Sequence, residues 1–176
     1  GVSVNADNIV MRTLNGDDLI GLCPSVKIIY QDVISKIKQK MPEVNELEDN
    51  TIGISANFLS GNNDRFRLHF DRNQLTVVIY LNDADSFPLI LYPNIREDPA
   101  SSGIKEKFDL KTAKSETVFP KQNLAVVFYG RRTFHGVSNS NTDYNEYKKR
   151  YSLQFAFDFD ISDYSNRYYY GKSNSK

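Results

Sequence analysis

The first regular pattern of apolar and polar residues along the chain has the period of a helix. Between Pro24 and Met41 apolar residues recur every three or four positions, and lysines and glutamines occupy the opposite side. These apolar residues are Val26, Ile29, Tyr30, Val33, Ile34, Ile37 and Met41. Pro24 suits the first turn of a helix, and Pro42 is typical of a residue that follows its end. We expect a helix over 23–41 whose apolar face packs on another layer.

After residue 50 the pattern changes to the period of β-strands, in which apolar and polar residues alternate. Residues that favour turns, such as Asn82-Asp83, separate these short segments. The expected strands are 51–59, 65–70, 74–81, 87–92, 116–119, 124–129, 135–138 and 150–159. This order predicts a mainly β fold, a double-stranded β-helix of the jelly-roll, cupin-like kind, with the N-terminal helix packed on the outer face of one sheet.

The last expected strand has one polar and one apolar face. Its residues divide between these faces as Arg150, Ser152, Gln154 and Ala156 on the first, and Tyr151, Leu153, Phe155 and Phe157 on the second. The apolar face should pack against the core or the helix. The polar face could be exposed to water, but in a double-sheet fold we expect it to line a cavity.

Length and composition describe one globular domain. The chain has 176 residues, and Lys plus Arg and Asp plus Glu both total 22. We expect a single domain over 1–176, with the β-roll at about 50–160 and a polar, Tyr-rich tail at 161–176. The absence of net charge and of a long basic run argues against nucleic acid or an anionic membrane as the main partner. No stretch approaches the ~20 apolar residues that span a bilayer.

Cys23 is the only cysteine, so the chain cannot form an internal disulfide. This favours a reducing compartment, and we expect a cytoplasmic protein. Because Cys23 precedes Pro24 at an apolar helix start, we expect a buried, structural thiol rather than a nucleophile. The chain begins at Gly1 and has no charged-then-apolar signal pattern, so we expect a trimmed or processed form.

The two histidines of the chain, His69 and His135, lie in different expected strands. Asp71 follows His69 by two positions, which places both side chains on one face of an extended strand, with Cα atoms ~6.5 Å apart. Two histidines and one carboxylate on one side of a metal form the facial triad of non-haem iron(II) oxygenases, which leaves positions open for substrate and dioxygen. The alternative is that both histidines are ordinary hydrogen-bonded strand residues.

Arg150 and Tyr80 extend this pattern. A guanidinium binds a carboxylate through two parallel hydrogen bonds, and its burial is unfavourable unless an anion pairs with it. A dicarboxylate that chelates iron at one end would supply that anion at its other end. Tyr80 shares a face with Thr76 and Val78, so its hydroxyl could reach the same cavity. The alternatives are an exposed arginine and a core tyrosine.

The order of these motifs resembles the 2-oxoglutarate/iron(II)-dependent dioxygenases, and within them the prolyl 4-hydroxylase-like branch that includes hydroxylases of hypoxia-inducible factor. The resemblance covers about residues 50 to 160. It is carried by His69-x-Asp71, TVVIYLN at 76–82, LILYP at 89–93, LAVVFYGRRTFHGV at 124–137 and RYSL at 150–153.

The resemblance implies a hydroxylase that couples oxidation of a C–H bond to conversion of 2-oxoglutarate into succinate and CO2. It implies iron(II), 2-oxoglutarate and O2 as cofactors and co-substrates, with ascorbate as a supporting reductant. The residues that it implies are His69, Asp71 and His135 for the metal, and Arg150, Tyr80, Thr76 and Ser152 for 2-oxoglutarate.

Two features depart from the family. Ser86-Phe87-Pro88 stands where the family often has a Gly-Gly pair. The segment 139–147, expected to form an extended hairpin, makes the distance from His135 to Arg150 longer than usual. A shifted alignment there would give the anchoring role to Lys148 or Lys149, but Arg150 is favoured because a clean strand follows it.

The substrate is less clearly indicated. Arg65, Arg67, Arg131 and Arg132 lie next to the candidate ligands and could bind an anionic group or a peptide backbone, or they could be ordinary solvated charges. The Lys-rich segment 94–115 is expected to be a long mobile loop that could close over a substrate. The resemblance favours a prolyl residue in a peptide or protein. A free amino acid or natural-product intermediate is the alternative, and a non-catalytic, cupin-like metal- or ligand-binding module is the alternative of another class.

Overall fold

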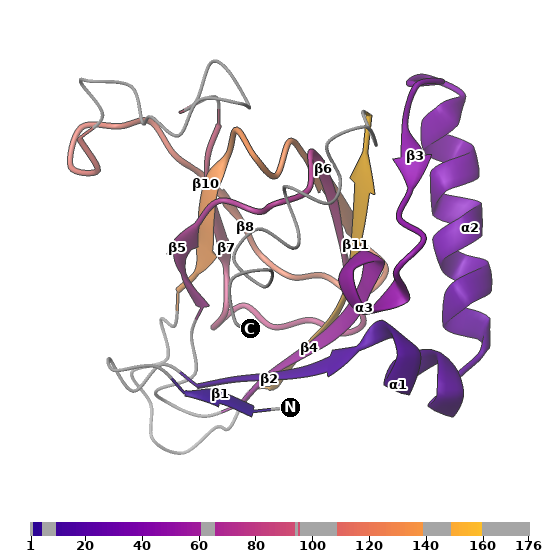
Figure 1. Ribbon diagram of the computed structural model, residues 1–176. Coiled ribbons are helices and arrows are strands. Elements are labelled where there is room, and N and C mark those ends of the chain that lie inside the picture. The colour runs from indigo at the N-terminus through magenta and orange to yellow at the C-terminus, as the bar shows by residue number, and fades with distance from the viewer. Residues whose placement is uncertain are drawn as a thin grey trace, which may run out of the picture.

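The computed structural model describes residues 2–4, 10–60, 66–93, 95, 109–138 and 149–159. Two antiparallel sheets face each other, and the helices pack on the outer side of the larger one (Figure 1). This is the double-stranded β-helix that the strand pattern predicts. The expected hairpin at 139–147 and the tail at 161–176 lie outside the described residues, as does most of the expected loop at 94–115.

The larger sheet has the strand order β1-β2-β4-β11-β6-β9, and β3 pairs with β11 off this path. Its strands are β1 (Val2–Val4), β2 (Val10–Asn15), β3 (Asn45–Glu46), β4 (Ile54–Ser60), β6 (Leu75–Tyr80), β9 (Ala125–Phe128) and β11 (Lys149–Asp158). β11 is the longest of these and lies between β4 and β6. It therefore forms the centre of the sheet, where one face is available to the helices and the other to the interior.

The smaller sheet has the order β5-β10-β7-β8. Its strands are β5 (Phe66–His69), β7 (Leu89–Tyr92), β8 (Glu116–Val118) and β10 (Phe134–Val137). Each of the eight expected strands has its counterpart in one of the two sheets. The order in the sheets shows that β5 and β10, which carry the two histidines, are direct neighbours although more than sixty residues separate them.

The beginning of the chain differs from the expectation. β1, β2, β3 and the short helix α1 (Gly16–Leu22) are not predicted by the sequence pattern. The first expected strand starts later than predicted because Asp49 caps a single helical turn, α3 (Asn50–Gly53), by accepting a hydrogen bond from Thr51 N. β2 pairs with β4, so the larger sheet extends beyond the expected β-roll at 50–160.

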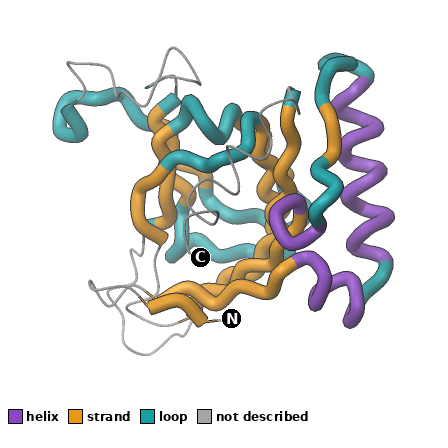
Figure 2. The backbone as a smooth tube through the Cα atoms, viewed as in Figure 1, coloured by secondary structure: helices purple, strands orange, loops and turns teal. Residues whose placement is uncertain are grey.

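The expected N-terminal helix is α2 (Ser25–Lys38), which ends a few residues earlier than the predicted boundary. Tyr30 is fully buried on its inner face and stacks on Phe157 of β11, with ring centroids 4.8 Å apart. The Tyr30 hydroxyl donates to Ala156 O and accepts from Leu47 N, both at 3.0 Å. These contacts hold the helix on the outer face of β11. Figure 2 shows the long helix along one side of the strands.

The expectation of a buried Cys23 is wrong. The residue is the C-cap of α1, between the two helices, and its side chain is exposed and contacts the Ser25 hydroxyl. The apolar helix start therefore points Val26 inward and leaves the thiol outside. None of the described helices is long and apolar enough to cross a membrane.

β11 divides the interior as its alternation predicts. Leu153, Phe155 and Phe157 belong to the core cluster under α2, whereas Arg150, Ser152 and Gln154 line a cavity between the two sheets. A second apolar cluster fills the rest of the space between the sheets. Its members include Leu59, Val78, Tyr80, Phe87, Leu89, Phe128 and Val137.

Candidate metal centre

His69 and His135 stand directly opposite each other on β5 and β10, and their ring centroids are 4.3 Å apart. The pairing register shifts between His135 and Val137. Gly136 lies at this shift, where a Cβ would come within 2.7 Å of Phe66 O and 2.9 Å of Leu68 N. Only glycine lets the two backbones approach this closely, so the irregularity helps to bring the two imidazoles to the same place.

Asp71 follows the end of β5 and completes the cluster. Its Oδ1 lies 3.1 Å from His69 Nε2 and 3.4 Å from His135 Nε2. The ligand atoms of all three residues lie within 4.8 Å of one another. Two nitrogens and one oxygen from three side chains thus point at one small volume, which is the geometry that a divalent metal requires.

The other nitrogen of each imidazole is already used. His69 Nδ1 lies 2.9 Å from Arg67 O, and His135 Nδ1 lies 2.9 Å from Thr133 O. A carbonyl only accepts, so each Nδ1 donates its proton there, and each Nε2 is the ring nitrogen that faces Asp71 and could bind a metal. Backbone carbonyls that fix histidine ligands in this way are common around protein metal sites.

The second oxygen of Asp71 is held by a hydrogen-bonded pair behind it. Asp71 Oδ2 accepts from the Thr76 hydroxyl at 2.5 Å, and Asn73 Nδ2 donates to Thr76 Oγ1 at 2.7 Å. Gly130 O accepts from Asp71 N at 3.0 Å. A Cβ at Gly130 would come within 2.5 Å of Thr76 Oγ1, so this position also favours glycine. The carboxylate is therefore fixed with Oδ1 toward the histidines.

The lowered pKa of Asp71 is consistent with a site for a cation. Burial by itself would raise the pKa of Asp71, but hydrogen bonds to His135 and His69 and their charge interactions outweigh it and hold that pKa well below its usual range. Asp71 is thus ionised at neutral pH. The donor set fits iron(II): two imidazole nitrogens and one carboxylate oxygen, with room left for further ligands.

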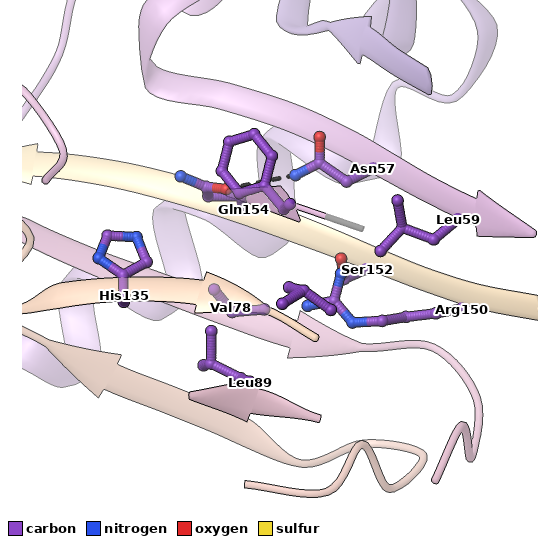
Figure 3. Close-up of a pocket in the computed structure, with 10 residues that line it drawn as sticks. Asn57, Leu59, Val78, Leu89, His135, Arg150, Ser152 and Gln154 are labelled. Atoms are coloured by element: carbon purple, nitrogen blue, oxygen red, sulfur yellow. Dashed lines mark hydrogen bonds between the residues drawn. The ribbon is translucent and has the colours of Figure 1, made fainter. Parts of the chain in front are cut away.

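A cavity in the space between the sheets reaches this cluster at His135 (Figure 3). It contains about 410 Å³ of empty space, part of which is open to solvent. His135 lies at one end, and the Arg150 side chain enters at the other, beside Ser152. The lining residues come from both sheets and are Asn57, Leu59, Phe66, Val78, Leu89, His135, Val137, Arg150, Ser152 and Gln154.

The Arg150 end of the cavity holds polar groups that have no partner. Arg150 Nε, the Tyr80 hydroxyl and the Ser152 hydroxyl are buried and form no hydrogen bond in the described part of the chain. The guanidinium lies over the Tyr80 ring, 5.1 Å from its centroid. Burial raises the pKa of the Tyr80 hydroxyl and lowers that of Arg150, and each group partly offsets the shift of the other. Two hydroxyls beside a buried guanidinium whose Nε forms no hydrogen bond to a described residue make a candidate anion site.

The remaining candidate residues are placed as follows. Thr76, expected to line the 2-oxoglutarate pocket, donates to Asp71 Oδ2 and is not among the residues that line the described cavity. Arg67 is exposed, and its carbonyl orients His69. Arg131 and Arg132 line a separate depression beside Tyr129. Arg65 lies outside the described residues.

Several supporting residues were missed by the sequence analysis. Asn73 and Gly130 act through contacts between distant segments, for which the sequence carries no local signal. Asn57 and Gln154 also line the cavity, joined by a hydrogen bond. Gln154 was expected there, because the strand pattern places it on the polar face of β11 in line with Arg150, and only its partner Asn57 was missed.

No protein-family model matches the chain, and no curated protein matches it in sequence. Solved structures do match. The epimerase SnoN of nogalamycin biosynthesis, described as non-haem and alpha-ketoglutarate dependent, aligns with a TM-score of 0.65 at 13% identity over 89% of this chain. The chain spans 66% of that enzyme, so about a third of the epimerase has no counterpart here.

Two further solved structures are similar to the chain in fold. A prolyl-4-hydroxylase from Pseudomonas putida aligns with a TM-score of 0.54 at 18% identity, over 89% of this chain and 77% of that one. HygX from Streptomyces hygroscopicus, with nickel, 2-oxoglutarate and hygromycin B bound, aligns with a TM-score of 0.54 at 11% identity, over 84% and 69%. The chain has the fold of these enzymes. At these identities the likeness speaks for the fold, and the chemistry rests on the residues themselves.

Proposed function

We propose that the chain is an iron(II)- and 2-oxoglutarate-dependent dioxygenase that hydroxylates a C–H bond. One observation carries the proposal: a His–Asp–His cluster and an anion site occupy opposite ends of one cavity. The cluster alone would suit many metalloproteins. The buried Arg150 adds a requirement for a ligand that carries a negative charge at its far end.

His69, Asp71 and His135 would hold the iron. Three ligands on one side leave the opposite side open, and Thr76 and the two backbone carbonyls keep these ligands in place. When bound, iron(II) with 2-oxoglutarate and O2 supplies the oxidising chemistry, in which 2-oxoglutarate is converted to succinate and CO2. Ascorbate would act as a supporting reductant.

Arg150, Tyr80 and Ser152 would bind the far carboxylate of 2-oxoglutarate. The guanidinium supplies the charge, and the two hydroxyls supply neutral donors that now lack a partner. Lys149, the alternative anchor, is exposed at the start of β11, whereas Arg150 is only 4% exposed. The side chains of Val78 and Leu89 between the two ends keep water away from the ligand.

For the substrate, we propose a prolyl residue in a peptide or protein, in line with the resemblance of the sequence motifs. A small natural product is the second candidate, because two of the similar structures, SnoN and HygX, are described in complex with nogalamycin RO and hygromycin B. Of the four arginines considered for substrate binding, Arg131 and Arg132 border a depression of their own and could contact a substrate there.

A non-catalytic, cupin-like binding module is the competing class of function. Such a module needs no anchor for a carboxylate, and a buried guanidinium without an anion is unfavourable for it. No carboxylate of the described residues pairs with Arg150. A 2-oxoglutarate-dependent enzyme accounts for the buried Arg150, whereas a non-catalytic binding module leaves its burial unexplained.

The test is succinate release. Purified protein with iron(II), ascorbate and 2-oxoglutarate is given prolyl peptides, free amino acids and small natural products in parallel, and succinate is measured. We expect one class to stimulate release, and His69→Ala and Asp71→Ala to remove it. Asp85→Ala, at an exposed surface acid, is the matched control and should retain activity. Undiminished release by either ligand variant would contradict the proposed site.

A further inference from the structure

A row of three polar side chains crosses the inner face of the larger sheet from β2 through β4 to β11. The Thr13 hydroxyl donates to Asn57 Oδ1 at 3.0 Å, and Asn57 Nδ2 donates to Gln154 Oε1 at 3.2 Å. Thr13 and Asn57 are also a direct cross-strand pair. The row begins on a strand that lies outside the expected β-roll and ends in the cavity.

This row fixes the orientation of the Gln154 amide. Because Oε1 accepts from Asn57, the amide nitrogen must point the other way, and Figure 3 shows it directed toward the end of the cavity where His135 lies. No described residue accepts a hydrogen bond from Gln154 Nε2. The cavity therefore presents an oriented but unused donor at its metal end.

The order of side chains along β11 indicates which kind of ligand this donor could bind. Arg150, Ser152 and Gln154 follow one another on the inner face at intervals of about 6.5–7 Å. The first two lie at the anion site, and Gln154 lies farther along the cavity, on the side where His135 lies (Figure 3). Apolar side chains form the wall between them, among them Val78, Leu89 and Val137. The order polar, apolar, polar matches a short linear acid that has oxygen atoms at both ends.

We propose that Gln154 is a ligand-binding residue that donates a hydrogen bond from Nε2 to an oxygen at the metal-bound end of 2-oxoglutarate, and that Thr13 and Asn57 are positioning residues that hold this amide. The inference rests on the proposed function and adds to it a contact on the reacting end of the ligand. A neutral donor suits an oxygen that already shares its charge with a metal. An amide held by its neighbours loses little conformational entropy when the ligand binds.

The test compares two ligands by titration calorimetry of the Mn(II)-loaded protein without oxygen. 2-Oxoglutarate has oxygens at both ends, and pentanoate has a carboxylate at one end only. Gln154→Met keeps the length of the side chain and removes the donor. We expect it to weaken 2-oxoglutarate binding about tenfold, as for a lost hydrogen bond in a closed site, and to change pentanoate binding by less than about twofold.

Gln154→Glu is the second variant. Its carboxylate still accepts from Asn57 Nδ2 but faces the ligand oxygen with a negative charge, so we expect at least as large a loss of 2-oxoglutarate affinity. Asn57→Ala should weaken 2-oxoglutarate binding about threefold on its own, and by almost nothing in the Gln154→Met background, because it acts through Gln154. Gln31→Met, on the exposed side of α2, is the matched control and should bind as the unaltered protein does.

The outcomes separate the inference from the function on which it rests. Unchanged 2-oxoglutarate affinity in both Gln154 variants would overturn the inference alone. An equal loss of affinity for 2-oxoglutarate and pentanoate would also overturn it, because Gln154 would then act only by packing in the cavity wall. If the unaltered protein binds no 2-oxoglutarate in the presence of metal, the proposed function fails together with the inference.

Discussion

The Thr76 hydroxyl donates a hydrogen bond to Asp71 Oδ2 at 2.5 Å, and this contact leaves Oδ1 as the oxygen that faces both histidines. A carboxylate on a short turn could otherwise rotate between several positions. The sequence resemblance assigned Thr76 to the co-substrate, and in the structure its hydroxyl bonds Asp71, a candidate metal ligand. Thr76 is therefore expected to control metal affinity.

Thr76→Val removes the hydroxyl and keeps the shape of the side chain. We expect it to weaken iron(II) or Mn(II) binding by about 10–100-fold, as is typical when a partner of a metal ligand is lost. Thr76→Ser keeps the donor and should bind metal within about threefold of the unaltered protein. Metal titration followed by calorimetry measures both. Equal affinity in the valine variant would show that Asp71 needs no such support.

Gly136 is expected to be intolerant of even one methyl group. A Cβ there would meet Phe66 O and Leu68 N on β5, so Gly136→Ala should push β5 away from β10 and separate His69 from His135. We expect lower thermal stability and a loss of metal binding. Gly21→Ala is the control, since a Cβ at Gly21 meets nothing within 4 Å and alanine favours the helix. Normal metal affinity in Gly136→Ala would contradict the role assigned to the register shift between His135 and Val137.

Arg150 should be unfavourable for stability and necessary for ligand binding. Arg150→Met replaces a buried charge, to which no described residue offers a carboxylate, with an apolar side chain of similar length. We expect an unchanged or higher melting temperature for the ligand-free protein, because a desolvated charge is removed. The increase in melting temperature on addition of 2-oxoglutarate and metal should disappear. Lys149→Met, at the exposed neighbour, should retain that increase.

Two results would contradict this account of Arg150. A large fall in the melting temperature of the ligand-free Arg150→Met protein would show that the guanidinium supports the fold. A preserved response to 2-oxoglutarate would place the carboxylate anchor elsewhere in the chain.

Tyr30 should affect stability without affecting chemistry. Tyr30→Phe removes a buried hydroxyl that bonds both Ala156 O and Leu47 N, and it leaves the Leu47 N–H without this partner. We expect the free energy of unfolding to fall by about 1–3 kcal/mol, measured by urea denaturation, while metal affinity stays the same. Tyr151→Phe, at a half-exposed ring, is the control and should change neither quantity. A change in metal affinity would link the helix to the site.

The sequence predicted most of the β-roll because β11 and its neighbours follow simple alternation. Arg150 and Leu153 fall on the expected faces because a central strand between two filled layers has little freedom. The strands before residue 50 were missed. β2 is stabilised by its pairing with β4 rather than by its own pattern, and such long-range pairing leaves no local signal.

The candidate site was predictable only in part, for the same reason. His69 and Asp71 are two residues apart, so strand geometry predicted their proximity, although Asp71 lies just past the end of β5. The placement of His135 depends on the neighbouring position of β5 and β10, which resemblance to a family suggested and periodicity did not. Cys23 was misplaced because its position at the end of α1 depends on how two helices meet.

The central claim is that one cavity binds a metal through His69, Asp71 and His135 and an oxo acid through Arg150. The most direct measurement is an anaerobic optical titration of the unaltered protein with iron(II) and then 2-oxoglutarate. The account predicts a weak visible metal-to-ligand charge-transfer band that saturates with 2-oxoglutarate and is absent from Asp71→Ala. Saturating iron(II) binding without any such band, or the same band in Asp71→Ala, would contradict it.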